Sequence, residues 1–199
     1  ATPTSLGPWG YMVRRGPSAI LVDVPYYSDG LVDEVRKLAP RGVTHLLLTH
    51  DDFVQMSKHA SWKLAFPDLV RVAYYTDCPR GSMEVELSGN GTWEVAGFRI
   101  YHVPGHSEGS LFFVSPELSA VFTGDSIGVW GNEPTGFGAY CRFSCGTQAK
   151  SLRGFARAAP SCKAILPSHG LPKYVEDQQE LLAFFDAAAE GLDGGRNSP

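Results

Sequence analysis

The sequence predicts an α+β fold in which two β-sheets pack face to face and helices cover their outer faces. Two observations support this prediction. Residues 11–75 alternate apolar strands with amphipathic helices, and helix returns in residues 148–190, whereas residues 83–122 contain only short strands. A strand-rich centre between helix-containing ends favours two stacked sheets over one doubly wound parallel sheet.

The chain is expected to begin with a hairpin. Tyr11–Arg14 and Ala19–Val24 are strand-like segments separated by a Gly-Pro turn, and only one aspartate interrupts the second segment near its end. A helix then opens at Ser28 and stops before Pro40, because its apolar residues fall on one face. Val43–Leu48 follows as a buried strand.

A second helix is expected directly after this strand. Its predicted apolar stripe consists of Phe53, Met56, Ala60 and Leu64. Val70–Tyr75 then predicts another strand, so this part of the chain alternates strand and helix with short connections.

The middle of the chain predicts a meander of strands. Five short apolar segments are separated by Gly, Asn and Pro: Met83–Leu87, Thr92–Val95, Phe98–Val103, Leu111–Val114 and Ala120–Phe122. No helical pattern separates them.

The last part returns to helix. A helix over Gln148–Ala158, a strand over Lys163–Leu166 and a helix over Val175–Glu190 that ends at Gly191 are predicted. We expect one domain over residues 1–199, with residues 193–199 frayed because they lack core-forming side chains.

Composition limits the classes of partner. The chain has 17 Lys and Arg against 21 Asp and Glu, a formal net charge of -4, and no run of like charges, so nucleic acid is not an expected partner. No apolar stretch reaches the roughly 18–20 residues that cross a bilayer, so no membrane partner is expected either. A small-molecule substrate is the expected partner.

The cysteines favour a reducing compartment. Of the 4 cysteines, only Cys141 and Cys145 are close in sequence, and their spacing is not that of a zinc knuckle or a thioredoxin-type site. An intracellular location, cytoplasmic or organellar, is therefore expected. The first residue is Ala rather than Met, which indicates a trimmed N-terminus.

Polar side chains follow several apolar strands at the point where each strand is expected to end. They are His50, His106, Asp125 and His169. Loops at strand ends gather side chains from distant parts of a sequence. Imidazole and carboxylate groups that converge there would form a metal site.

Four segments carry a resemblance to a known family. Thr49–His50, Pro104–Ser110, Phe122–Asp125 and Pro167–Gly170 are similar, in their order and spacing, to the motifs of the metallo-β-lactamase fold. The resemblance covers nearly the whole chain and implies a four-layer αββα sandwich with its site at one edge. Within these segments, Gly105 and Gly124 would allow the sharp turns that present His106 and Asp125.

The first motif departs from the family pattern. The family reads His-x-His-x-Asp-His, whereas residues 50–55 read His-Asp-Asp-Phe-Val-Gln. Asp52 stands in place of the second histidine, Val54 cannot ligate, and Gln55 is a weak ligand. The resemblance implies the metal ligands His50, Asp52, His106, Asp125 and His169, but only a mononuclear centre.

The first hypothesis is a hydrolase with one Zn or Fe ion. The resemblance then implies cleavage of an ester, thioester, lactone or related bond, with Asp52 or Asp125 accepting a proton from water. Gln55 and Tyr140 are the expected hydrogen-bond donors to the substrate.

Two alternatives stay open. In one, the site has lost its metal, and the protein has a binding or structural role. In the other, His50, His106 and Asp125 form a 2-His-1-carboxylate triad for iron, as in the persulfide dioxygenases of this fold.

The other three histidines are expected to have mainly structural roles. His59 is expected to lie mainly on a helix surface, although it could rotate toward the site, and His45 and His102 are expected to be ordinary strand residues. Phe137, Tyr140 and Phe143 line either the mouth of a pocket or an aromatic plug. Cys78 and Cys162 are expected to be buried, small apolar side chains.

Overall fold

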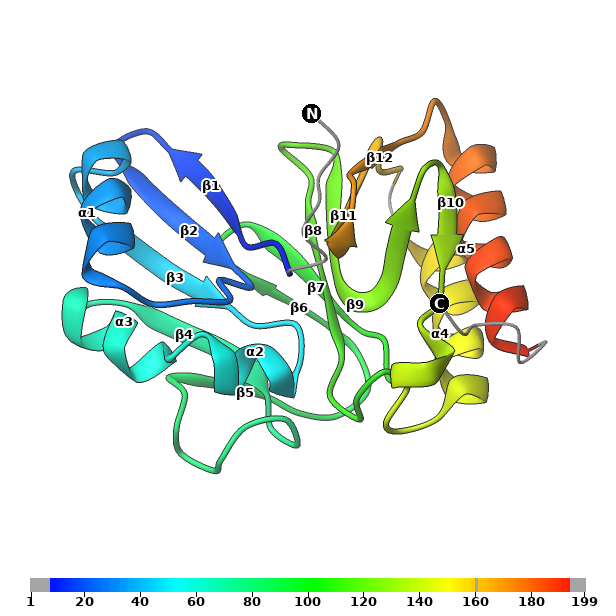
Figure 1. Cartoon of the computed structure of the whole chain (residues 1–199), viewed down its shortest axis with the longest axis horizontal. Helices are drawn as coiled ribbons and strands as arrows, with labels where there is room; N and C mark the ends of the chain where they lie inside the picture. The colour runs from blue at the N-terminus through cyan, green and yellow to red at the C-terminus, as the bar shows by residue number, and fades with distance from the viewer. Residues whose placement is uncertain (1–7, 160, 194–199) are drawn as a thin grey trace.

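The computed structural model describes residues 8–159 and 161–193. Two sheets lie face to face, with α1 and α3 outside the first sheet and α4 and α5 outside the second (Figure 1). The predicted αββα sandwich is therefore confirmed.

The first sheet has the strand order β1-β2-β3-β4-β5, and only its β1/β2 hairpin is antiparallel. Its strands are β1 (Tyr11–Arg15), β2 (Ser18–Val22), β3 (Val43–Leu47), β4 (Val70–Tyr74) and β5 (Val85–Leu87). Its helices are α1 (Asp29–Leu38), α2 (Asp51–Met56) and α3 (His59–Ala65). Ser28 caps α1, because its hydroxyl accepts a hydrogen bond from the Leu31 amide.

The second sheet has the order β12-β11-β9-β8-β7-β6, and β10 pairs with β9. Its strands are β6 (Thr92–Val95), β7 (Phe98–His102), β8 (Leu111–Ser115), β9 (Ala120–Trp130), β10 (Glu133–Thr135), β11 (Ala164–Gly170) and β12 (Lys173–Tyr174). The predicted meander is confirmed for β6 to β9. A 3-10 turn η1 (Gly138–Tyr140) leads to α4 (Cys145–Ala158), and α5 (Gln178–Asp193) ends the described chain.

Three apolar clusters correspond to the interfaces between the four layers. The first contains side chains from both sheets, such as Val22, Leu47 and Phe113. The second joins the first sheet to α1, α2 and α3, and the third joins the second sheet to α4 and α5. Cys78 and Cys162 are buried in the two outer clusters, as predicted.

The helix predicted after β3 is broken into α2 and α3. Lys58 precedes α3 in a left-handed conformation with φ 50°, which ends any continuous helical stripe. Met56 and Leu64 are 40% and 83% exposed, so their predicted place in the core is wrong. Ala60 is exposed as well, Phe53 is buried as predicted, and Trp62 is the buried side chain of α3.

Some strand predictions were also wrong. Met83–Leu87 was predicted to start the meander, but β5, which lies within this segment, joins the first sheet parallel to β4. The predicted ends of β9 and β11 fell short, so Asp125 and His169 lie within strands. The small strands β10 and β12 were missed because two or three residues carry no clear periodicity.

The C-terminal helix α5 differs from the predicted helix Val175–Glu190 at both ends. It begins at Gln178 rather than Val175 and continues past Gly191 to Asp193, whose carboxylate pairs with Arg153 at 2.8 Å. Asp193 is therefore helical rather than frayed, and residues 194–199 lie outside the described residues. Among the described helices, none is both long and apolar enough to span a bilayer.

Gly105 and Gly124 shape the backbone beside the predicted ligands, as expected. Gly105 has φ +151°, and a Cβ there would lie 2.3 Å from the Cα of Gln148 in α4. Gly124 has φ +55°, and a Cβ there would lie 2.3 Å from the hydroxyl of Thr49. The two turns therefore require residues without a side chain.

We predict that Gly105→Ala lowers the free energy of unfolding by more than about 2 kcal/mol, because the new methyl group meets backbone atoms of α4. Chemical denaturation measures this change. Gly154→Ala is the matched control in α4, where a Cβ meets no atom within 4 Å, and it should stabilise by up to about 1 kcal/mol. Equal effects of the two substitutions would contradict the prediction.

Candidate metal centre

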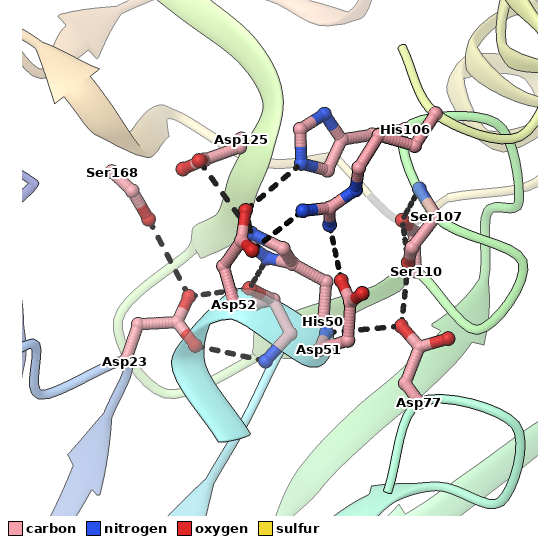
Figure 2. Close-up of polar contacts among 12 residues, drawn as sticks. Asp23, His50, Asp51, Asp52, Asp77, His106, Ser107, Ser110, Asp125 and Ser168 are labelled. Carbon is pink, nitrogen blue, oxygen red and sulfur yellow. Dashed lines mark hydrogen bonds and ion pairs between the residues drawn. The ribbon is translucent and has the colours of Figure 1, made fainter. Parts of the chain in front are cut away.

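Four predicted ligands converge where α2 meets the second sheet (Figure 2). His50 follows β3 and forms the N-cap of α2, and Asp52 lies in the first turn of this helix. His106 lies in the loop between β7 and β8, and Asp125 lies within β9. The site is therefore assembled from both sheets.

One ligand atom from each of these four residues lies within 4.8 Å of the others. His50 Nε2 is 3.5 Å from Asp125 Oδ2 and 3.6 Å from Asp52 Oδ2. His106 Nε2 is 4.0 Å from Asp52 Oδ2. These separations exceed those of good hydrogen bonds, so the atoms face a shared centre rather than one another.

Several of these atoms are buried without a hydrogen-bond partner among the described residues. They are His50 Nε2, His106 Nδ1 and Nε2, and Asp125 Oδ1. Buried polar atoms without partners are costly, and a coordinated cation would satisfy those that face the centre. Two imidazole nitrogens and two carboxylate oxygens are a donor set that suits zinc or iron.

The two imidazoles have opposite pKa shifts. Burial lowers the pKa of His50, but the carboxylates of Asp125 and Asp52 outweigh burial and raise it to about 10. Burial, together with the charge of His50, lowers the pKa of His106 to about 3. His106 is therefore neutral at pH 7, the form in which imidazole binds metals, whereas a cation at the centre would displace the proton of His50.

A buried aspartate that the sequence analysis did not select supports His50. The Asp23 carboxylate accepts hydrogen bonds from the amide and hydroxyl of Thr49, at 2.8 and 2.6 Å, and the hydroxyl lies 2.9 Å from His50 Nδ1. Burial raises the pKa of Asp23 to about 7. Its interruption of an apolar strand was a signal that could have identified it.

Asp77, also missed, joins α2 to the His106 loop. Its carboxylate accepts hydrogen bonds from the Ser107 hydroxyl at 2.5 Å, the Gly109 amide at 2.8 Å and the Asp51 amide at 3.2 Å. Asp77 follows β4 and is buried. No local pattern in the sequence distinguishes it from a surface aspartate.

Arg142 is the third residue that the sequence analysis missed. Its guanidinium donates to Asp52 Oδ1 at 2.5 Å and also to Asp51, and its backbone amide donates to the His106 carbonyl at 2.9 Å. Arg142 therefore fixes which oxygen of Asp52 faces the centre. The contacts of Arg142 with Asp51 and Asp52 span about 90 residues of sequence, so no local spacing reveals them.

Of the remaining predicted residues, His169 contacts a member of the centre. His169 Nε2 is 3.4 Å from Asp125 Oδ2, although His169 is not one of the four converging residues. Gln55 is exposed on α2, and Tyr140 is 60% exposed in η1. Their predicted contacts with substrate stay predictions. His59 instead contacts Arg71, with 2.8 Å between the two nitrogens.

We predict that Asp77→Asn weakens metal binding at least about tenfold and lowers the free energy of unfolding by roughly 2 kcal/mol. The amide keeps one acceptor oxygen, so the loop of His106 and the start of α2 lose part of their connection. Metal titration and thermal unfolding measure the two effects. The exposed Asp68→Asn is the control, and unchanged metal affinity in the Asp77 variant would contradict the prediction.

No family model matches the chain. The chain is 30% identical over 175 residues to the lactamase-like protein notP from Aspergillus sp. (strain MF297-2), an alignment that covers 81% of this chain and 48% of that one. It is 27% identical over 172 residues to an atrochrysone carboxyl ACP thioesterase from Emericella nidulans, with 80% and 50% covered. The chain thus spans about half the length of these curated relatives.

Solved structures share the fold. The metallo-β-lactamase FIM-1 from Pseudomonas aeruginosa, in its mono-zinc form, has a TM-score of 0.70 and 22% identity, with 91% of this chain and 82% of that chain covered. At this identity the likeness shows the fold alone. The chain therefore has the metallo-β-lactamase fold, with lactamase-like relatives and a first motif that departs from the family pattern.

Proposed function

We propose that this chain is a metal-dependent hydrolase that cleaves the thioester bond of a small molecule. The convergence of two imidazoles and two carboxylates, with several of their buried atoms lacking hydrogen-bond partners among the described residues, is the observation that carries the proposal. The relatives include a protein named as an ACP thioesterase, which favours a thioester over an ester or lactone.

His50, Asp52, His106 and Asp125 would hold one Zn²⁺ or Fe²⁺, and His169 stands beside Asp125 as a further ligand. When bound, such an ion acts as a Lewis acid that polarises a carbonyl and acidifies water. Val54 packs in the core between the first sheet and its helices. It leaves the second metal position of the family without a carboxylate.

The chain's own carboxylates have different tasks in this proposal. Arg142 holds Asp52 Oδ1, so only Oδ2 of Asp52 faces the centre. Asp125 Oδ1 is buried without a hydrogen-bond partner among the described residues and can accept a hydrogen bond that orients the attacking water. Hydrolysis adds this water across the C–S bond and releases a carboxylic acid and a thiol. Gln55 and Tyr140, whose side chains are exposed, would donate hydrogen bonds to the substrate.

We predict that the purified protein binds about one equivalent of zinc or iron and hydrolyses benzoyl-N-acetylcysteamine. His106→Ala should lose both properties with little loss of stability, because both ring nitrogens of His106 lack partners within the described residues. His45→Ala is the control, since His45 lies in β3 and contacts Thr44. Elemental analysis and a thiol-release assay measure the two properties.

The outcomes separate the alternatives. Metal and turnover that persist in His106→Ala would contradict the proposed site. A protein without metal even after reconstitution would favour the binding or structural role, in which Arg142 neutralises Asp51 and Asp52. Bound iron with oxygen uptake on addition of glutathione persulfide, and no thioester hydrolysis, would favour the dioxygenase.

A further inference from the structure

We propose that Trp130, Phe137 and Tyr140 form an aromatic platform that binds a flat aromatic ring in the acyl part of the substrate. This inference rests on the proposed thioester hydrolysis and names its substrate class. In it, the ring of Tyr140, rather than its hydroxyl, is the group that recognises the ligand.

The platform adjoins the metal centre. The ring of Phe137 lies 5.4 Å from the ring of His169, at 68°. His169 in turn lies 3.4 Å from the Asp125 carboxylate, measured from Nε2 to Oδ2. An acyl group whose carbonyl faces the four ligands therefore has aromatic surface within reach.

The rings of Trp130 and Phe137 pack directly against the backbone of β9 at Gly128. A Cβ on Gly128, in this strand, would lie 2.1 Å from Trp130 Cζ3 and 2.5 Å from Phe137 Cε2. The two rings pack edge to face, with 4.9 Å between their centroids. Phe137 has φ 48°, a strained conformation for a bulky residue and a type that is common at functional sites.

The platform also has a fixed position relative to the metal ligands. Tyr140 packs against Phe137 with 6.3 Å between ring centroids. The chain that follows Tyr140 is tied to the His106 loop, because the Arg142 amide donates to the His106 carbonyl and the Ser144 amide to the Gly105 carbonyl. A ring bound on the platform would thus hold the acyl group at one position beside the centre.

Exposure and charge indicate the class of ligand. Tyr140 and Trp130 are 60% and 37% exposed, so each still has ring surface for a ligand to cover. Arg142, two residues after Tyr140, is already paired with Asp51 and Asp52. Uncharged rings that already pack edge to face suit another aromatic ring better than an anionic group.

The test compares 2-naphthoyl-N-acetylcysteamine with octanoyl-N-acetylcysteamine as thioester substrates. Tyr140→Leu should lower kcat/KM for the naphthoyl substrate roughly threefold to tenfold, mainly through KM, and change the octanoyl value less than twofold. Tyr140→Phe keeps the ring and should keep the naphthoyl value. Tyr174→Leu is the control, because Tyr174 is 71% exposed and pairs with Ala164 at the other end of β11 from His169.

Equal losses for the two substrates in Tyr140→Leu, or a loss in Tyr140→Phe as large as that in Tyr140→Leu, would overturn the proposal. A second measurement does not depend on turnover: calorimetric titration of 2-naphthoate and octanoate into the wild type and both leucine variants. If naphthoate binds more tightly than octanoate, and only Tyr140→Leu weakens this binding, the platform is supported. This holds even if no thioester is cleaved, because absent turnover contradicts only the proposed function. Equal binding of the two acids, or no binding of naphthoate, overturns the platform.

Discussion

The site depends on one buried contact between neighbouring strands of the first sheet. Because β2 and β3 run parallel, Asp23 and Thr49 follow the same end of the sheet, where the carboxylate binds both the amide and the hydroxyl of Thr49. The hydroxyl in turn meets the ring nitrogen of His50. Asp23 has φ 50°, an uncommon conformation for a residue with a side chain. The turn after β2 is thus held in the shape that places the His50 ring.

The αββα architecture and the four converging ligands could be predicted from the sequence, because they depend on local patterns. Apolar periodicity marks the strands, and His50, His106 and Asp125 stand in short motifs. Asp77 and Arg142 could not be found in this way, because each acts through contacts with residues distant in the sequence. The break before α3 was missed for a related reason: tertiary packing of Trp62 overrides the helical spacing of Leu64.

The altered first motif places an apolar side chain, Val54, where the family has a carboxylate. Val54 stands at the position of the family's aspartate and is buried in the same apolar cluster as Phe53 and Trp62. A carboxylate there would be desolvated beside those side chains and would need a cation to offset the cost. With valine, α2 packs on the sheet through this apolar cluster. In the proposed function, the other donors would hold one ion.

The carboxylates around the centre are balanced by the protein's own cations and imidazoles. Arg142 pairs with Asp51 and Asp52, whereas His50 and His169 face Asp125. Charged pairs thus lie around α2 and around Asp125, and the uncharged rings of Phe137 and Trp130 follow next to His169. Under the proposed function, an acyl thioester contacts both the four ligands and the rings only if its ring lies on the platform while its carbonyl faces the ligands. The shape of the acyl group, rather than its charge, is then the property by which such a site discriminates between substrates.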